Sequence, residues 1–173
     1  MSFRKRVGLV AVVGLFTFFQ GRPNTFESDT LKITYASSWA VQDKNELQQC
    51  REEGYDCQLV VADARFGSTA VIVARFDPPG SMSPSEIAKF ARNALSQQPG
   101  VDVESMETVQ VDGLEAVRFF YSAPMSNEQH YGMELYVVKG NWAYEITVES
   151  ANAGIFREKR KDIDAFIEGM DFL

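Results

Sequence analysis

Residues 133–149, MELYVVKGNWAYEITVE, decide the fold of this chain. Two runs rich in β-branched and aromatic residues, 133–139 and 142–149, flank Gly140-Asn141, a pattern typical of two antiparallel strands joined by a tight turn. The second run alternates between two sets of residues: Trp142, Tyr144, Ile146 and Val148, and Ala143, Glu145, Thr147 and Glu149. Because strand side chains alternate between the faces of a sheet, we expect one buried face and one partly in contact with water.

Further strands precede this hairpin. Asp112-Gly113 separates a strand that ends at Val111 from one that runs over 114–121, and such a turn requires positive φ. The runs 58–64 and 69–76 predict another hairpin, and residues 31–35 alternate as a short strand.

Two amphipathic helices are expected. Ser83-Pro84-Ser85-Glu86 has the features of a helix start, because Ser83 and Glu86 have capping-box spacing and proline suits the first helical position. Its predicted buried stripe is Ile87, Phe90, Ala91, Ala94 and Leu95. The stripe of a C-terminal helix is Ile155, Phe156, Ile163, Phe166, Ile167 and Met170. This order predicts an α+β domain in which helices sandwich an antiparallel sheet, not the alternating βαβ order of a nucleotide-binding fold.

The charge is unevenly distributed along the 173 residues, which are 45% hydrophobic, 24% charged and 12% aromatic, with a net charge of −7. Four of the 17 basic residues (Arg4, Lys5, Arg6 and Arg22) lie before the first acidic residue, Glu27. The other 13 basic residues and all 24 acidic residues lie within residues 23–173, which therefore carry a net charge of −11. The phosphate backbone of a nucleic acid would repel so acidic a segment, and we therefore expect no nucleic-acid partner.

The N-terminal residues 1–22 are predicted to be a signal anchor or signal peptide, and residues 23–173 the globular domain. Arg4-Lys5-Arg6 precedes an uncharged, mostly apolar run over 7–19. As a hydrophobic helix this run would extend about 20 Å, less than the bilayer core of about 30 Å. Phe18 and Phe19 stand where a cleavage site needs small residues, which favours retention as an anchor. The basic start would stay in the cytoplasm and the acidic domain would cross the membrane. A buried N-terminal core helix is the alternative.

Cys50 and Cys57 are the two cysteines of the chain, and they are seven positions apart in a polar stretch that includes Gly54. In an oxidising compartment they are expected to form a disulfide. Their spacing differs from the two-residue spacing of zinc and redox motifs. Two reduced thiols are the alternative.

The sequence contains no recognisable catalytic or cofactor motif. His130 is the single histidine and is expected in a solvated loop. No phosphate-binding glycine loop is present, and we expect no metal, no cofactor and no enzymatic activity. The only dense basic patch of the body, Arg157, Lys159, Arg160 and Lys161, is a candidate docking surface for an acidic partner or lipid headgroups. Neighbouring acidic residues could instead pair with it along the helix.

Two segments resemble the PsbP-like superfamily. Residues 31–39, LKITYASSW, are similar to its opening strand and turn, with Ala36 in place of the usual proline. Residues 141–148 and the following helix resemble its closing strand and C-terminal helix. The resemblance covers residues 26–173 and implies an α/β/α sandwich with a non-catalytic accessory role. Members stabilise or help to assemble photosynthetic membrane complexes, are envelope lipoproteins, or bind a small GTPase. No cysteine follows the apolar run here to accept a lipid.

The sequence therefore predicts a membrane-tethered, extracytoplasmic (periplasmic or lumenal) accessory subunit or assembly factor of a larger membrane protein complex, with a photosynthetic complex among the candidates. The alternative is a periplasmic module that binds a small apolar ligand between sheet and helix. An enzyme ranks third, and a cluster of His130 with buried carboxylates would favour it.

Overall fold

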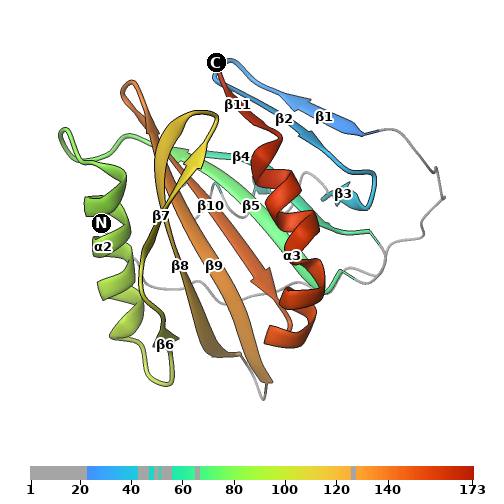
Figure 1. The fold of residues 1–173 in the computed structure, drawn as a ribbon, viewed down its shortest axis with the longest axis vertical. Coiled ribbons are helices and arrows are strands. Elements are labelled where there is room, and N and C mark those ends of the chain that lie inside the picture. The colour runs from blue at the N-terminus through green and yellow to red at the C-terminus, as the bar shows by residue number, and fades with distance from the viewer. Residues whose placement is uncertain (1–22, 43–46, 49–50, 52–55, 65–66, 126–127) are drawn as a thin grey trace.

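The computed structural model describes residues 23–42, 47–48, 51, 56–64, 67–125 and 128–173 (Figure 1). Its elements, in chain order, are β1 (Asn24–Glu27), β2 (Leu31–Tyr35), β3 (Trp39–Val41), β4 (Asp56–Asp63), β5 (Thr69–Phe76), α2 (Pro84–Ser96), β6 (Asp102–Val103), β7 (Glu107–Val111), β8 (Leu114–Met125), β9 (Glu128–Lys139), β10 (Trp142–Ser150), α3 (Ala153–Glu168) and β11 (Met170–Phe172).

The larger sheet is antiparallel throughout and has the order β3-β4-β5-β10-β9-β8-β6, with β7 also paired to β8. The hairpin predicted from residues 133–149 lies at its centre, where Trp142 pairs with Lys139 across Gly140 at φ 60°. The predicted turn at Asp112-Gly113 is confirmed, with φ of 50° and 70°.

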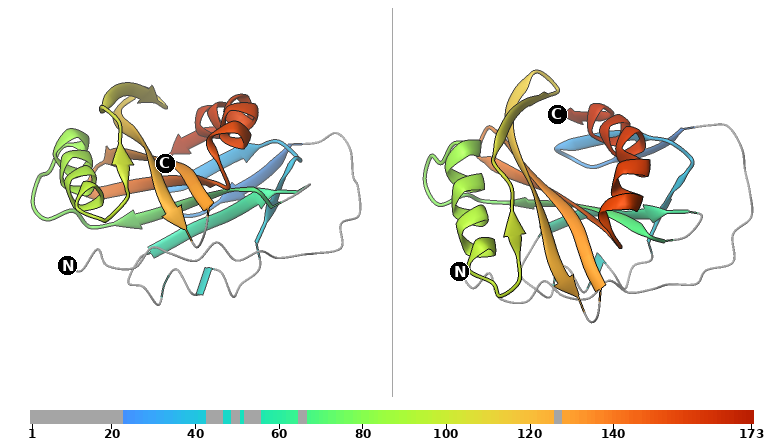
Figure 2. Two further views of the ribbon diagram at one scale, coloured as in Figure 1. Left: turned by 90° about the horizontal axis from the view of Figure 1, so that it is seen from below. Right: turned by 60° about the horizontal axis from the view of Figure 1, so that its bottom comes forward.

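The two helices lie on opposite faces of this sheet (Figures 1 and 2). We call the face that carries Tyr144, Ile146 and Val148 the α3 face, because these residues share one buried core with Phe156, Ile163 and Phe166 of α3. The other is the α2 face, where Val117, Phe119, Tyr121, Tyr136 and Ala143 pack with Ile87, Ala88 and Ala91 of α2. The predicted α+β sandwich of helices around an antiparallel sheet is therefore confirmed for the described residues.

A second sheet beside α3 was not predicted. Strands β1, β2 and β11 form a three-stranded antiparallel sheet, in which Met170 pairs with Ile33 and Phe172 with Leu31. The C-terminal helix was expected to include Met170, but α3 ends at Glu168 and Gly169 is its C-cap. Met170 and Phe172 instead point into the core from a strand.

The expected wet face of β10 is buried. Ala143, Glu145 and Thr147 are at most 4% exposed, and so is Glu134 on the neighbouring strand. Polar side chains occur in this layer because they bind one another: the Tyr136 hydroxyl lies 2.5 Å from Glu134 Oε2 and 3.2 Å from Glu145 Oε1. Thr147 donates a further hydrogen bond to Glu145. The alternation of side chains along β10 was predicted correctly, but the prediction that the face with Glu145 contacts water was wrong.

Helix α2 begins as the sequence predicts. Ser83 is the N-cap and forms a reciprocal capping box with Glu86, and Pro84 opens the helix. The predicted buried stripe is partly wrong, because Phe90 is 56% exposed and Ala88 takes a buried place beside Ile87.

The predicted N-terminal anchor over 1–22 lies outside the described residues, as does Cys50. Among the helices that the structure describes, none combines the length and hydrophobicity needed to span a bilayer.

The close approach of α3 to β2 depends on Gly169. A Cβ at this position would lie 1.9 Å from the backbone oxygen of Thr34, and the Thr34 amide donates to the Gly169 oxygen at 2.9 Å. We expect Gly169→Ala to lower the free energy of unfolding by about 3 kcal/mol, because the backbone itself must move. Urea denaturation measures this change.

Gly80→Ala is the matched control. Gly80 has positive φ, at 67°, whereas Gly169 has φ −81°, and nothing lies within 4 Å of the Cβ added at Gly80. Its cost should be limited to about 1 kcal/mol for the left-handed backbone. Equal losses in the two variants would contradict the packing role of Gly169.

Candidate functional site

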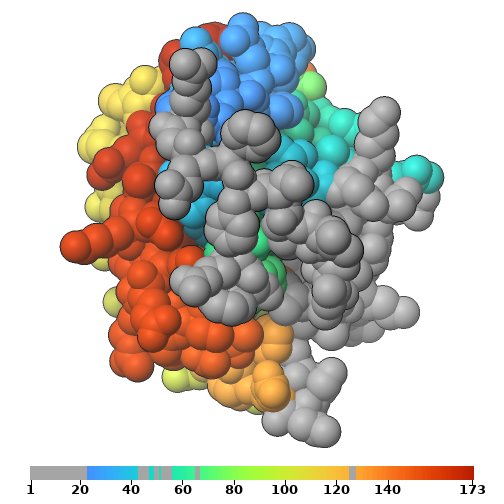
Figure 3. Space-filling view, turned by 90° about the vertical axis from the view of Figure 1, so that its right-hand side faces the viewer, coloured from blue at the N-terminus to red at the C-terminus, as the bar shows by residue number. Residues whose placement is uncertain are grey.

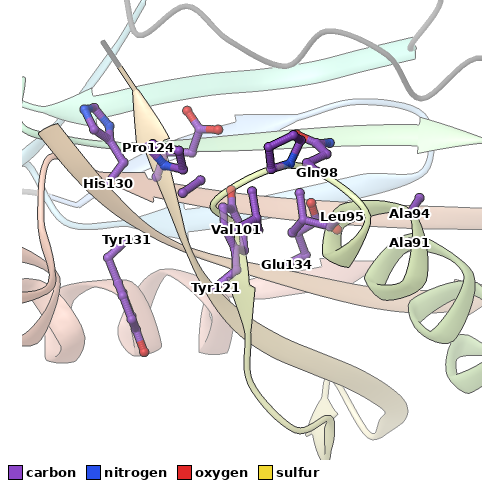
Figure 4. Close-up of a pocket in the computed structure, with 13 residues that line it drawn as sticks. Ala91, Ala94, Leu95, Gln98, Val101, Tyr121, Pro124, His130, Tyr131 and Glu134 are labelled. Atoms are coloured by element: carbon purple, nitrogen blue, oxygen red, sulfur yellow. The ribbon is translucent and has the colours of Figure 1, made fainter. Parts of the chain in front are cut away.

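Two clefts lie on opposite sides of the β8–β9 pair. The α2 cleft has a volume of about 130 Å³ and lies between α2 and the α2 face (Figure 4). Its lining residues are Ala91, Ala94, Leu95, Gln98, Pro99, Val101, Tyr121, Ala123, Pro124, His130, Tyr131, Glu134 and Glu149. The α3 cleft has a volume of about 410 Å³ and is lined by Glu104, Tyr131, Ala153, Phe156, Arg157 and Arg160.

The polar residues of the α2 cleft surround Gly132. His130 and Glu134 lie two positions to either side of Gly132 on β9, and Glu149 pairs with Gly132 from β10. Tyr121 pairs with Gly132 from β8, and a Cβ on Gly132 would lie 2.3 Å from the Tyr121 ring. Glycine is therefore required here so that the tyrosine ring can lie across the strand.

His130 lies in a strand and not in the predicted solvated loop. It is half-buried, and its Nδ1 atom is fully buried without a hydrogen-bond partner in the described part of the chain. Figure 4 shows it at the end of the cleft opposite Ala91 and Ala94. His130 and the buried Glu134 thus line one cleft, which is the kind of arrangement that would favour an enzyme.

The α2 cleft nevertheless lacks the groups of a familiar hydrolytic site. Its described lining contains no serine, threonine, cysteine or lysine that could act as a nucleophile beside the histidine. No group of three or more His, Cys, Asp or Glu residues in the described ranges is placed to hold a metal ion. The geometry of the cleft is suited to binding a small molecule between apolar walls and a polar end.

The α3 cleft is built on an aromatic cluster. The Tyr131 and Phe156 ring centroids are 5.0 Å apart, and the Phe120 and Phe156 centroids are 5.9 Å apart in an edge-on arrangement. Two guanidinium groups lie over Phe120, that of Arg160 at 5.0 Å and that of Arg118 at 5.5 Å. Such stacking provides cation–π attraction and also shields the Phe120 ring from water.

Acidic side chains hold these two arginines in place. Arg118 pairs with Glu107 from the neighbouring strand β7 and lies 3.6 Å from Asp164 of α3. Arg160 Nε donates to both Asp164 oxygens, at 3.1 and 3.0 Å. The result is a network of alternating charges that joins α3 to the β7–β8 hairpin.

The four predicted docking cations therefore have different environments. Lys159 pairs with the buried Asp63 at 3.2 Å, and Arg160 is held by Asp164. Arg157 and Lys161 are exposed, and neither forms an ion pair with another residue in the described ranges. Figure 3 shows that the outer surface of α3, in red, belongs to the exterior of the molecule. The docking role of all four residues stays a prediction.

The sequence did not reveal the rest of the α3 cleft. Tyr131 lies on β9, Phe120 on β8 and Glu104 directly after β6, and only the pairing of β8 with β6 and β9 brings them beside α3. A weak signal was present, because Tyr131 lies two positions before the start of the predicted strand 133–139, and alternation places it on the same face as Met133.

No protein-family model matches the chain, and no curated protein sequence matches it. Solved structures do match. Cyanobacterial PsbP (CyanoP) from Synechocystis has a TM-score of 0.64 at 9% identity, over 96% of this chain and 100% of that chain. LpqN from Mycobacterium tuberculosis, described as involved in cell envelope biogenesis, has a TM-score of 0.60 at 10% identity, over 89% and 86%. The Ran-binding protein Mog1p from Saccharomyces cerevisiae has a TM-score of 0.58 at 8% identity, over 87% and 95%.

These similarities show that the chain has the PsbP-like fold, as the resemblance in its first and last segments predicted. At such low identity they define the fold alone. The role of the two clefts must therefore be argued from the residues that line them.

Tyr131 gives a direct test of the α3 cleft. Burial, followed by the hydrogen bond and charge of Glu104, raises the pKa of Tyr131 to about 12, although Arg157 and Arg160 oppose the shift. The Tyr131 hydroxyl donates to Glu104 Oε1 at 2.7 Å. Because the folded-state pKa exceeds the unfolded value, the contribution of Tyr131 to stability is complete below pH ~10 and is lost as the pH rises toward 12.

We expect Glu104→Gln to lower the pKa of Tyr131 while leaving it above the ordinary tyrosine value, since burial is the largest cause of the shift. NMR titration of the tyrosine rings measures this, and Tyr131→Phe identifies the resonance. A Tyr131 that titrates at the ordinary value in the unmodified protein would contradict the described cleft.

Proposed function

We propose that this protein is a non-catalytic, extracytoplasmic accessory subunit or assembly factor that docks onto a larger membrane protein complex. Residues 1–22 would tether it to the membrane, and the acidic domain would lie on the far side. The basic and apolar N-terminal sequence supports the tether. The PsbP-like fold supports a binding role, because it is shared with a Ran-binding protein and with an envelope-biogenesis protein.

The observation that carries the docking proposal is a pair of exposed cations on α3: Arg157, which lines the aromatic α3 cleft, and Lys161, one turn further along the helix. Arginine and aromatic residues dominate the energetics of protein interfaces when they can be desolvated together. Tyr131 and Phe156 are held in fixed positions by their neighbours, so little conformational entropy would be lost on binding. An acidic segment of the partner would complement the two cations.

Only the shared fold bears on which membrane complex the protein docks onto. Cyanobacterial PsbP has the same fold, and this makes a photosynthetic complex one candidate. The electrostatic argument above is independent of that choice, since it requires only an acidic, membrane-bound partner surface.

Charge reversal tests the docking surface. We expect Arg157→Glu to weaken binding to the complex roughly tenfold, or about 1.4 kcal/mol, because an attractive contact becomes repulsive. The measurement is the amount of full-length protein that co-purifies with a defined membrane complex after mild detergent extraction. Added salt should weaken binding of the unmodified protein in the same direction.

Lys89→Glu is the matched control, since Lys89 is exposed on α2 and the substitution changes the charge by the same amount. It should leave co-purification unchanged. Equal losses from both variants would indicate a net-charge effect, and loss from neither would overturn docking through α3.

Export also predicts the state of the cysteines. Cys57 is buried on β4, and a disulfide with Cys50 stays the prediction. We expect both thiols to resist alkylation in protein taken from native membranes until a reductant is added. Replacement of both by serine should lower the free energy of unfolding by about 2 kcal/mol. Free thiols in the unreduced native protein would contradict an oxidising location.

A further inference from the structure

We propose that the α3 cleft binds a short peptide segment of the partner in which an acidic residue adjoins an aromatic one, with the carboxylate on Arg157 and the aromatic ring against Tyr131. This inference rests on the docking function proposed above and names the chemistry that docking would recognise. Such a segment is preferred over a long run of acidic residues and over an anionic lipid headgroup. Three features support it: the size of the cleft, its rigid aromatic wall and the charges around it.

The α3 cleft is large enough for two adjoining side chains. Its volume of about 410 Å³ lies within the range of ligand pockets, roughly 300 to 1,000 Å³, and exceeds the roughly 150 Å³ of cavities that hold one benzene ring. Ala153, in the first turn of α3, contributes only a methyl group to the lining. A carboxylate alone would leave most of this space empty, whereas a carboxylate with an adjoining ring would fill much of it.

The aromatic wall of the cleft is Tyr131, and its neighbours hold it in place. The Tyr131 ring stacks on Phe120, with centroids 6.4 Å apart and 18° between the ring planes, and it meets Phe156 edge-on at 5.0 Å. Its hydroxyl donates to Glu104 at 2.7 Å. Tyr131 is half-buried, so part of the ring stays open to the cleft. Because this ring is already ordered, an aromatic side chain can pack on it at little entropic cost.

Two guanidinium groups line the cleft beside this ring. Arg160 donates from Nε to Asp164, and its two terminal nitrogens have no hydrogen bond to another residue in the described ranges. Arg157 lies three positions earlier, a spacing that makes two side chains neighbours on a helix. Although burial raises the pKa of Tyr131, both guanidiniums act in the opposite direction, so their charges reach the cleft. A carboxylate suits the fork of donors that a guanidinium presents.

The surroundings of the two arginines limit the ligand to about one negative charge. Glu104 lines the cleft, and Asp164 already pairs with Arg160. Of the two guanidiniums, only that of Arg157 lacks an ion pair within the part of the chain that the structure describes. A run of acidic residues would place further charges against these carboxylates and against a domain with a net charge of −11. The remaining affinity must therefore come from apolar contact, which the adjoining ring provides.

The test measures the binding of short capped peptides to the full-length protein in a mild detergent. The first peptide has glutamate followed by phenylalanine at its centre and glycine and serine elsewhere. The second has glutamine in place of glutamate, and the third has alanine in place of phenylalanine. NMR chemical-shift titration gives the affinities, with the Tyr131 ring resonances as the site-specific readout. We expect the first peptide to bind with a dissociation constant below about 1 mM, and the other two at least about fivefold more weakly.

The competing ligand classes are represented by hexaglutamate and by glycerophosphoserine, the soluble headgroup of an anionic lipid. We expect both to bind at least about tenfold more weakly than the glutamate–phenylalanine peptide at physiological salt. Hexaglutamate that binds as tightly as the peptide would indicate a general site for acidic chains, and a headgroup that does so would indicate a lipid site. Either result would overturn the proposal, as would equal affinity of the three peptides or no binding of the first.

Two variants and one control locate the peptide. Arg157→Lys keeps the charge but removes the planar fork of donors, and Ala153→Leu narrows the cleft, so each should weaken binding of the first peptide about fivefold. Ala165→Leu makes the same change as Ala153→Leu at an exposed position about three turns further along α3, and it should leave affinity unchanged. Circular dichroism confirms that each variant is folded. Binding that persists in both cleft variants, or that is lost equally in Ala165→Leu, would place the peptide elsewhere.

Failure of this inference can be distinguished from failure of docking. The peptides are tested on the isolated protein, whereas docking is tested by co-purification of the Arg157→Glu variant with a membrane complex. Docking that depends on Arg157, in a protein that does not prefer the glutamate–phenylalanine peptide, would overturn the inference alone. Selective peptide binding by a protein that no complex retains would overturn docking and leave the specificity of the cleft established.

Discussion

The β8–β9–β10 meander determines most of this structure, because its two faces are both buried and each serves a different helix. Continuous register from Trp142–Lys139 to Ser150–Tyr131, and on to β8, fixes which side chains reach α3 and which reach α2. A shift of one residue would exchange Tyr144 with Glu145 and place a carboxylate in the apolar α3 core. The turn at Gly140 prevents such a shift between β9 and β10, and the turn at Asp112-Gly113 fixes the register of β7 against β8.

The same alternation separates the two candidate sites. Neighbouring residues of β9 line different clefts: Tyr131 faces the arginines of α3, whereas His130 faces the α2 cleft, although Tyr131 also contributes to the α2 cleft boundary. One surface is open and combines exposed cations with aromatic rings, which suits a macromolecular partner. The other is smaller and is lined mainly by apolar side chains, which suits a compact ligand. The β8–β9 pair thus contributes to two clefts, and Tyr131 lies at the boundary between them.

Local signals made much of the fold predictable, and non-local pairing accounts for what was missed. Ser83, Glu86 and Asp112-Gly113 were read correctly because capping and turn chemistry depend on residues a few positions apart. Met170 was misassigned because its spacing from Phe166 and Ile167 fits a helical stripe as well as a short strand, and only its pairing with Ile33 decides. Lys159 was counted as a docking cation because nothing local indicates its bond to Asp63, about a hundred positions away in the chain. The side chain of Glu145 was predicted to contact water, because its hydrogen-bond partner, the Tyr136 hydroxyl, comes from the neighbouring strand.

The central claim is that the protein docks onto a membrane complex through the α3 side of this sheet while the α2 side remains uncovered by that complex. Site-specific photo-crosslinking in native membranes tests it most directly, with a photoreactive amino acid placed at position 157 on α3 and, in a second protein, at position 89 on α2. The account predicts one discrete crosslinked product with a membrane protein from position 157 and none from position 89. Absence of a product from position 157, or the same product from both positions, would contradict it.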